Sequence, residues 1–394
     1  MRILFIILFL FTSFISTAQL RSGFDKNEAR DMIAFCNSYT FLDLYQNDEE
    51  IIPAGFKKVY SSQEYSLDNM FQVYTKGNIG VINLRGSTDE KSSWLQNFYS
   101  SLIPAAGEIG LKGKTIQYTF ATDTGATVHS GYALAIAYII EDVVEQINLL
   151  NEQKIFDIYI TGHSQGGAVA QLLMAQLHHL PGRTISFKNT FKTYAFASPM
   201  CGNRRFVQYY HNVINNGYSF NIINPADLVP TFPLTYNDST FFSMDEVINI
   251  LKDPGSFSIK RKIKDGAFRI LQNPLKFTME KLGGSVEKQI DKYGDDVVMP
   301  APVREINYAR MYETIEIMPA EYPKRLIDST ILTNDSLMAV YERDSNGDFT
   351  NAELYEKAPM FYQHKPYNYY VTIIKLYFPD NYVGLKQKYL QENL

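Results

Sequence analysis

The stretch that decides the fold of this chain is Ile155-Phe156-Asp157-Ile158-Tyr159-Ile160-Thr161-Gly162-His163-Ser164-Gln165-Gly166-Gly167-Ala168-Val169-Ala170. Its first half is rich in β-branched and aromatic residues, which favour a strand. Its second half begins an apolar stripe at helical spacing. The stretch therefore predicts a strand, a sharp turn at Ser164 and a helix.

Ser164 is flanked by Gly162 and Gly166, the spacing of a nucleophile elbow. Such a turn holds the serine in a strained conformation, with strand and helix so close that neither flanking position can carry bulk. The helix N-terminus then faces the reacting centre, where the N–H of Gln165 can bind an oxyanion. The alternative interpretation is a glycine-rich turn with a surface serine.

The chain has 394 residues and a formal net charge of −5. This suits one large α/β domain with additions, or two domains, and gives no indication of a nucleic-acid partner. A basic start, an apolar run and small residues up to Ala18 predict a signal peptide over residues 1–18, and hence a secreted or periplasmic protein. The alternative is a membrane anchor, which needs an apolar run of about 20 residues, longer than this one.

The segments Met70–Lys76 and Ile79–Arg85 are predicted to be two strands joined by a Gly-Asn hairpin turn. The second strand runs directly into Gly86 and Ser87, where an acyl-transfer enzyme needs a second backbone donor for its oxyanion. We therefore expect Ser87 and Gln165 to form the oxyanion hole. The alternative is an ordinary turn at the end of a strand.

Strands and helices alternate from about residue 128 to residue 230, which predicts a mostly parallel sheet with helices on both faces. In such sheets the active site forms at the carboxyl ends of the strands, and Asp227 follows one of these ends. The expected chain order is serine, acid, histidine, and His364 is the one histidine after Asp227. A solvated loop is the alternative for His364. His163 is expected to point away from the site, and His129 to be a packing residue.

Three segments resemble the class 3 lipases, the fungal-lipase-type branch of the α/β-hydrolases. They are the elbow 162–167, Leu84-Arg85-Gly86-Ser87 with Trp94-Leu95, and Asn224-Pro225-Ala226-Asp227-Leu228-Val229-Pro230. The resemblance covers about residues 60–235. It implies an α/β-hydrolase fold and a secreted esterase or lipase that acts on carboxylic esters, often acylglycerols, without a cofactor.

The two cysteines, Cys36 and Cys201, are predicted to be buried free thiols, with a single disulfide as the alternative. Cys201 stands where the resembling family usually has an aliphatic residue, which favours a buried thiol.

The distance along the chain from Asp227 to His364 is long for this family and predicts an insertion. We expect residues 19–240 to form the first part of the hydrolase core and residues 241–310 to form a helical insertion. One hypothesis makes this insertion a cap that shapes the acyl pocket or lies on an anionic lipid surface. The alternative is a helical insert packed on the main domain. Residues 311–394 are expected to return to the core with His364, a strand at Tyr369–Phe378 and a helix.

The loop Glu342–Glu353 has the oxygen spacing of a calcium-binding EF-hand loop. Its candidate ligands are Asp344, Asn346, Asp348 and Glu353. The first ligand position carries glutamate where aspartate is required, so an acidic surface turn explains the loop equally well.

Together these residues predict a serine hydrolase for lipid esters, with Ser164 as nucleophile, His364 as base and Asp227 as the acid that orients it. The expected partners are a lipid or other ester substrate and, as an open hypothesis, a lipid surface; the protein is expected to be a monomer without cofactor. Alternatives are a phospholipase A-type or feruloyl-type esterase, and a non-catalytic lipid-binding relative.

Overall fold

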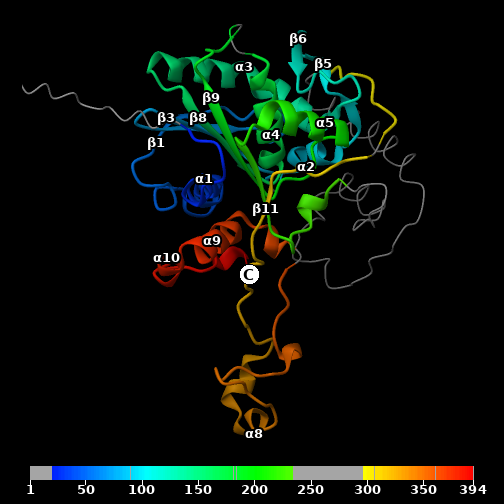
Figure 1. Ribbon diagram of the computed structural model, residues 1–394. Coiled ribbons are helices and arrows are strands. Elements are labelled where there is room, and N and C mark those ends of the chain that lie inside the picture. The colour runs from blue at the N-terminus through cyan, green and yellow to red at the C-terminus, as the bar shows by residue number, and fades with distance from the viewer. Residues whose placement is uncertain are drawn as a thin grey trace, which may run out of the picture.

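The computed structural model describes residues 20–233 and 296–393, apart from Asp89, Pro181, Arg183, Ile306 and Met360. The predicted signal peptide, and residues 241–295 of the predicted insertion, lie outside the described residues. Within the described part of the chain, no helix combines the length and the apolar character needed to cross a lipid bilayer. Figure 1 shows a main body built around one sheet, from which a narrow lobe extends.

A seven-stranded sheet with the order β1-β2-β3-β8-β9-β10-β11 runs through the main body (Figure 1). The pairs β1–β2 and β2–β3 are antiparallel, and all later pairs are parallel. The strands are β1 (Lys57–Ser61), β2 (Phe71–Lys76), β3 (Ile79–Leu84), β8 (Asp157–His163), β9 (Thr190–Phe196), β10 (Ser219–Ile223) and β11 (Thr314–Glu316). This confirms the mostly parallel sheet that the alternation of strands and helices predicts.

Helices cover both faces of the sheet, and each face has its own apolar core. Because successive side chains of a strand point to opposite faces, Val81 and Tyr159 enter the core under α1 and α9, whereas Ile82 and Ile160 enter the core under α3 and α4. The covering helices are α1 (Lys26–Tyr45), α9 (Pro366–Tyr377), α3 (Ser130–Glu152) and α4 (Gln165–His178). The continuous apolar strands are therefore buried on both sides.

Smaller elements surround this frame. They are α2 (Lys91–Phe98), α5 (Arg204–Tyr209) with the π-helical turn Tyr210–Asn215, and the antiparallel pairs β4 (Leu102–Pro104) with β7 (Thr127–His129) and β5 (Ala106–Leu111) with β6 (Lys114–Thr119).

The described end of the predicted insertion, residues 296–310, runs as extended chain along these small sheets. Gly110 and Val298 exchange backbone hydrogen bonds of 2.9 and 3.0 Å, and the N–H of Val303 donates to the carbonyl of Leu102 at 2.7 Å. Residues 296–310 therefore differ from the helical structure expected for this segment.

The prediction of a strand at Tyr369–Phe378 is wrong. This segment belongs to α9, which is followed by α10 (Pro379–Val383). Its aromatic and β-branched residues favour a strand, but Pro366 stands in the first helical turn, where its missing N–H costs no hydrogen bond. Tyr369 and Ile373, one helical turn apart, both enter the core under the sheet. Packing against the sheet thus decides the structure over local propensity.

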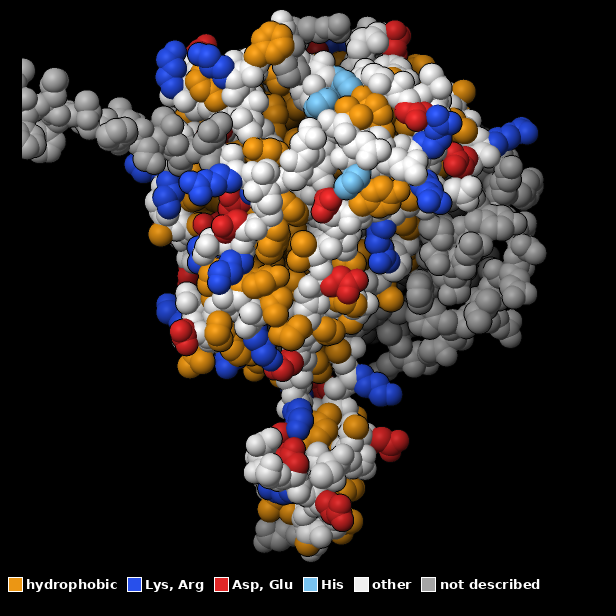
Figure 2. Space-filling view, in the orientation of Figure 1, with side chains coloured by type: hydrophobic (Ala, Val, Ile, Leu, Met, Phe, Trp, Pro, Cys, Tyr) orange, Lys and Arg blue, Asp and Glu red, His pale blue; other side chains and the backbone are white. Residues whose placement is uncertain are grey.

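Between β11 and α9 the chain leaves the main body and forms the lobe, defined as residues 323–359 (Figures 1 and 2). Its two arms pair at Leu326 and Tyr355, and α8 (Asp335–Met338) lies at its far end. Among its described side chains, the buried hydrophobic ones are Ile331 and Phe349. Acidic and basic side chains lie on its visible surface (Figure 2). No apolar periodicity in the sequence predicts this lobe.

Both cysteines are buried and free, as predicted. The thiol of Cys36 lies 3.4 Å from the Thr161 hydroxyl, and the thiol of Cys201 donates to the Gln171 side chain at 3.4 Å. Burial raises the pKa of each thiol to about 12, so both remain protonated at neutral pH.

Candidate active site

Ser164 stands at a sharp turn between β8 and α4, with φ 59° and ψ −129°. A Cβ atom at Gly162 would lie 2.3 Å from the backbone of Gly166, and one at Gly166 would lie 2.5 Å from the carbonyl oxygen of Leu84. Both distances are far below a normal contact, so the crossing of strand, turn and helix requires glycine on each side of the serine. The turn leaves the Ser164 side chain partly exposed at the carboxyl end of β8.

His364 lies in hydrogen-bond contact with both Ser164 and Asp227. Nε2 of His364 is 2.8 Å from Oγ of Ser164, and its Nδ1 is 2.8 Å from Oδ2 of Asp227. The Asp227 side chain is 1% exposed and that of His364 17%. With the Nδ1 proton directed at the carboxylate, Nε2 is free to accept the proton of the serine hydroxyl.

Three different elements bring these side chains together. Ser164 follows β8, Asp227 lies in the loop after β10, and His364 ends a single 3₁₀ turn before α9. The carboxyl ends of the parallel strands meet at one edge of the sheet, so Ser164 and Asp227 lie at the same edge although β9 separates their strands. The Asp227 carboxylate is held by the N–H of Val229 at 3.0 Å and by the Tyr369 hydroxyl at 2.8 Å.

His163 lies beside the site, so the expectation that it points away is wrong. Its ring centre is 4.8 Å from that of His364, and its ring packs edge-on against Tyr369 at 5.3 Å. Burial, followed by the nearby His364, holds the pKa of His163 well below its ordinary value. The His163 imidazole is therefore neutral and packs against the turn that carries His364.

The predicted oxyanion loop lies directly against the elbow. A Cβ atom at Gly86 would be 2.7 Å from the carbonyl oxygen of His163. The Ser87 hydroxyl donates to the side-chain oxygen of Gln165 at 3.1 Å and accepts a 2.8 Å bond from the Asn97 amide. Ser87 and Gln165 are thus neighbours, as an oxyanion hole built from their N–H groups requires.

The histidines other than His163 and His364 have separate places. His129 is fully buried at the start of α3, where it stacks on Tyr132 with ring centres 3.8 Å apart, and burial lowers its pKa to about 3. This confirms its expected role in packing. His178 and His179 lie at the far end of α4.

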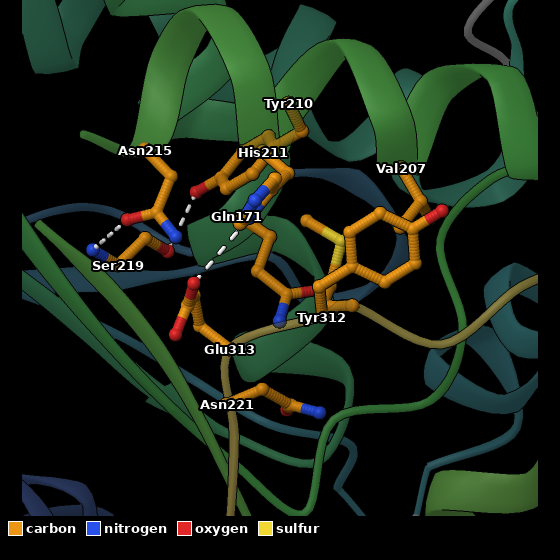
Figure 3. A pocket seen from close by; sticks show the side chains of 10 residues that line it. Gln171, Val207, Tyr210, His211, Asn215, Ser219, Asn221, Tyr312 and Glu313 are labelled. Atoms are coloured by element: carbon orange, nitrogen blue, oxygen red, sulfur yellow. Dashed lines mark hydrogen bonds and ion pairs between the residues drawn. The ribbon is translucent and has the colours of Figure 1, made fainter. Parts of the chain in front are cut away.

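His211 lines a small cavity, drawn in Figure 3, whose lining also includes Gln171 of α4. Its Nδ1 lies 3.4 Å from a carboxylate oxygen of Glu313, and Asn215 and Ser219 also line the cavity. The cavity measures about 10 Å³, about the space that one water molecule needs. It is too small for an ester substrate.

The acidic loop that suggested calcium binding is paired with a lysine. The Lys324 ammonium lies 2.7 Å from Asp348 and 3.4 Å from Asp344. The Asp344 carboxylate also accepts the N–H groups of Asn346 and Asp348 at 2.9 and 3.0 Å. In the described ranges, no group of three or more His, Cys, Asp or Glu side chains could hold a metal ion. The ammonium of Lys324 therefore compensates part of the negative charge of this loop.

Sequence reasoning missed the polar residues that hold this site in place. Asn97 lies two residues after Trp94-Leu95, one of the resembling segments, but no sequence pattern shows that it reaches Ser87. The composition around Tyr369 favours a strand, and a strand at this position gives no reason to expect its contact with Asp227. The remaining ones, Asn224 and Gln363, join two loops that are 139 residues apart in the chain, and no local pattern announces such a pair.

Part of the chain is similar in sequence to known proteins. Residues 81–237 match the family model described as lipase (class 3). The lipase ZK262.3 of Caenorhabditis elegans is 33% identical over 92 residues, and the toxin TseL of Vibrio cholerae is 28% identical over 134 residues. These matches cover 23% and 32% of this chain but only 25% and 18% of those proteins.

Among solved structures, a triacylglycerol lipase whose catalytic centre is described as a serine protease triad is similar to this chain. The similarity has a TM-score of 0.42 at 20% identity and covers 54% of this chain and 77% of that lipase.

Proposed function

We propose, from the match of residues 81–237 to the class 3 lipase family model, that this protein is an exported serine hydrolase that cleaves carboxylic esters of lipids. The observation that carries the proposal is the pair of 2.8 Å contacts that links Ser164 to His364 and His364 to Asp227. The name of the similar C. elegans protein supports the same class of enzyme. The signal-peptide pattern of residues 1–18 supports export.

In the first half of the reaction, Oγ of Ser164 attacks the ester carbonyl carbon while Nε2 of His364 takes the hydroxyl proton. The carbonyl oxygen becomes an oxyanion that the N–H groups of Ser87 and Gln165 hold. His364 then gives its proton to the alkoxy oxygen, the C–O bond breaks, and the alcohol leaves an acyl-enzyme behind. Asp227 orients the imidazole and stabilises its charged form throughout.

In the second half, water replaces the alcohol. Nε2 of His364 takes a proton from the water, whose oxygen attacks the acyl carbon. The second tetrahedral intermediate uses the same oxyanion donors. Its collapse returns the proton to Ser164 and releases the carboxylic acid.

The test is a panel of p-nitrophenyl esters of rising chain length, together with emulsified triacylglycerol and phospholipid. We expect hydrolysis by the wild type, and a loss of about 10⁴-fold or more in kcat for Ser164→Ala. The matched control is Ser345→Ala, an exposed serine in the lobe, which should behave like the wild type. Full turnover by Ser164→Ala would refute the proposal, and binding of lipid without cleavage by the wild type would favour the non-catalytic alternative. The chain-length profile separates an esterase from a lipase or phospholipase.

A further inference from the structure

The lobe joins the main body through a short neck, defined as residues 320–322 on the outgoing side and residues 361–363 on the returning side. The Gln363 side chain closes this neck with two hydrogen bonds to Ala320. It accepts the Ala320 N–H at 2.8 Å and donates to the Ala320 carbonyl at 2.9 Å. Tyr362 adds a third closure, since its hydroxyl donates to the carbonyl of Glu321 at 2.6 Å.

Gln363 also touches the loop that carries the acid. The side-chain amide of Asn224 donates to Oε1 of Gln363 at 2.7 Å, so this oxygen serves both Asn224 and Ala320. Asn224 is 2% exposed and shapes the acid loop. Its side-chain oxygen accepts the N–H of Ala226 and its backbone carbonyl accepts the N–H of Asp227, each at 2.9 Å. The Gln363 side-chain amide therefore connects the acid loop to both segments of the neck.

We propose that Gln363 is a positioning residue, which fixes the loop of His364 on the acid loop and so keeps the imidazole between Ser164 and Asp227. This inference rests on the proposed function of those three residues. His364 follows Gln363 directly and sits on a single 3₁₀ turn, a short element with little internal support. The imidazole must reach two partners at once, so a small displacement of its backbone breaks at least one contact.

A purely structural role would make Gln363 only a closure of the neck. Tyr362 distinguishes the two roles, because its hydroxyl closes the same neck but bonds to Glu321 and not to the acid loop. If closure of the neck were what matters, Tyr362→Phe and Gln363→Ala would have similar effects. If positioning is what matters, only Gln363→Ala disturbs the reaction.

The experiment compares Gln363→Ala, Tyr362→Phe and the remote control Gln153→Ala, whose side chain makes an exposed bond at the end of α3. With a soluble p-nitrophenyl ester, Gln363→Ala should lower kcat by about 10- to 100-fold and leave KM within about twofold of wild type. Tyr362→Phe and Gln153→Ala should keep kcat within about twofold. Unchanged kcat in Gln363→Ala, or an equal loss in Tyr362→Phe, would overturn the inference.

A second measurement does not depend on turnover. The Nδ1 proton of His364, hydrogen bonded to Asp227, should give a far-downfield proton resonance that His364→Gln removes. We expect Gln363→Ala to shift or broaden this resonance, and Tyr362→Phe to leave it in place. If the wild type hydrolyses no ester, the proposed function is wrong. The resonance would then still test whether Gln363 positions His364. An unchanged resonance in Gln363→Ala would count against positioning.

Discussion

The hydroxyl of Tyr369 donates a 2.8 Å hydrogen bond to Oδ2 of Asp227, the same oxygen that faces Nδ1 of His364. It also accepts the N–H of Asn224 at 3.0 Å. Tyr369 is 1% exposed, and its burial, followed by the charge of Asp227, raises its pKa well above the ordinary value. The hydroxyl therefore keeps its proton and remains a donor, so α9 holds the acid as well as covering the sheet.

Replacing Tyr369 by phenylalanine tests this contact. Tyr369→Phe leaves the buried N–H of Asn224 without its acceptor, which should lower the free energy of unfolding by about 1–3 kcal/mol. We expect kcat to fall by about tenfold because Asp227 loses one of its fixed donors. The control is Tyr367→Phe on the same helix, whose hydroxyl bonds to the Gln387 carbonyl away from the acid. Equal kcat values for the two variants would contradict this role.

The oxyanion loop gives a second prediction. Gly86→Ala places a Cβ atom 2.7 Å from the His163 carbonyl oxygen, so the loop must move away from the elbow and take the Ser87 N–H with it. We expect kcat to fall by about 10²- to 10³-fold, the usual cost of one lost oxyanion donor. Gly384→Ala is the control, since its nearest new contact is an ordinary 3.7 Å. Steady-state kinetics with circular dichroism measures both, and wild-type activity in Gly86→Ala would exclude Ser87 as a donor.

Stability should depend on pH through His129. Burial lowers its pKa to about 3, whereas an unfolded histidine has a pKa of about 6.5. Below pH 6.5 the unfolded chain therefore binds a proton that the folded chain does not, and the free energy of unfolding falls as the pH falls. Between pH 6.5 and 5 this histidine alone should cost about 2 kcal/mol.

Urea unfolding at pH 7 and pH 5 measures this loss. His129→Gln should be less stable at pH 7, but the difference between the two pH values should shrink by about 2 kcal/mol relative to wild type. An identical pH difference in wild type and variant would show that His129 does not titrate as its burial requires.

The two thiols should be unreactive in the folded protein. Cys36 and Cys201 are buried, and burial raises the pKa of both to about 12, so neither forms the thiolate that reacts. A colorimetric disulfide reagent should therefore detect no thiol before unfolding and both thiols after unfolding in guanidinium chloride. Rapid reaction of one thiol in the folded protein would contradict the structure around it.

The sequence predicts best those parts whose residue types follow from their geometry. The elbow is one, because the contacts at Gly162 and Gly166 exclude any side chain. The order of strands and helices along the chain is another, and it predicts the mostly parallel sheet. The placement of His364 followed from chain order alone, without knowledge of the turn that carries it.

The remaining features depend on contacts between distant segments. Tyr369–Phe378 has strand-like composition, but packing under the sheet and Pro366 make it a helix. The lobe buries few side chains and leaves no periodic pattern in the sequence. Gln363 and Asn224 meet across 139 residues, so their contact is visible only after folding.

The most direct test of the central claim is covalent labelling with a fluorophosphonate, which reacts with a serine hydroxyl that a neighbouring imidazole activates. Peptide mass spectrometry identifies the labelled residue in the wild type, in Ser164→Ala and in His364→Ala. We expect one labelled site, Oγ of Ser164, and no labelling in either variant. An unlabelled wild type, or labelling that persists in Ser164→Ala, would contradict it.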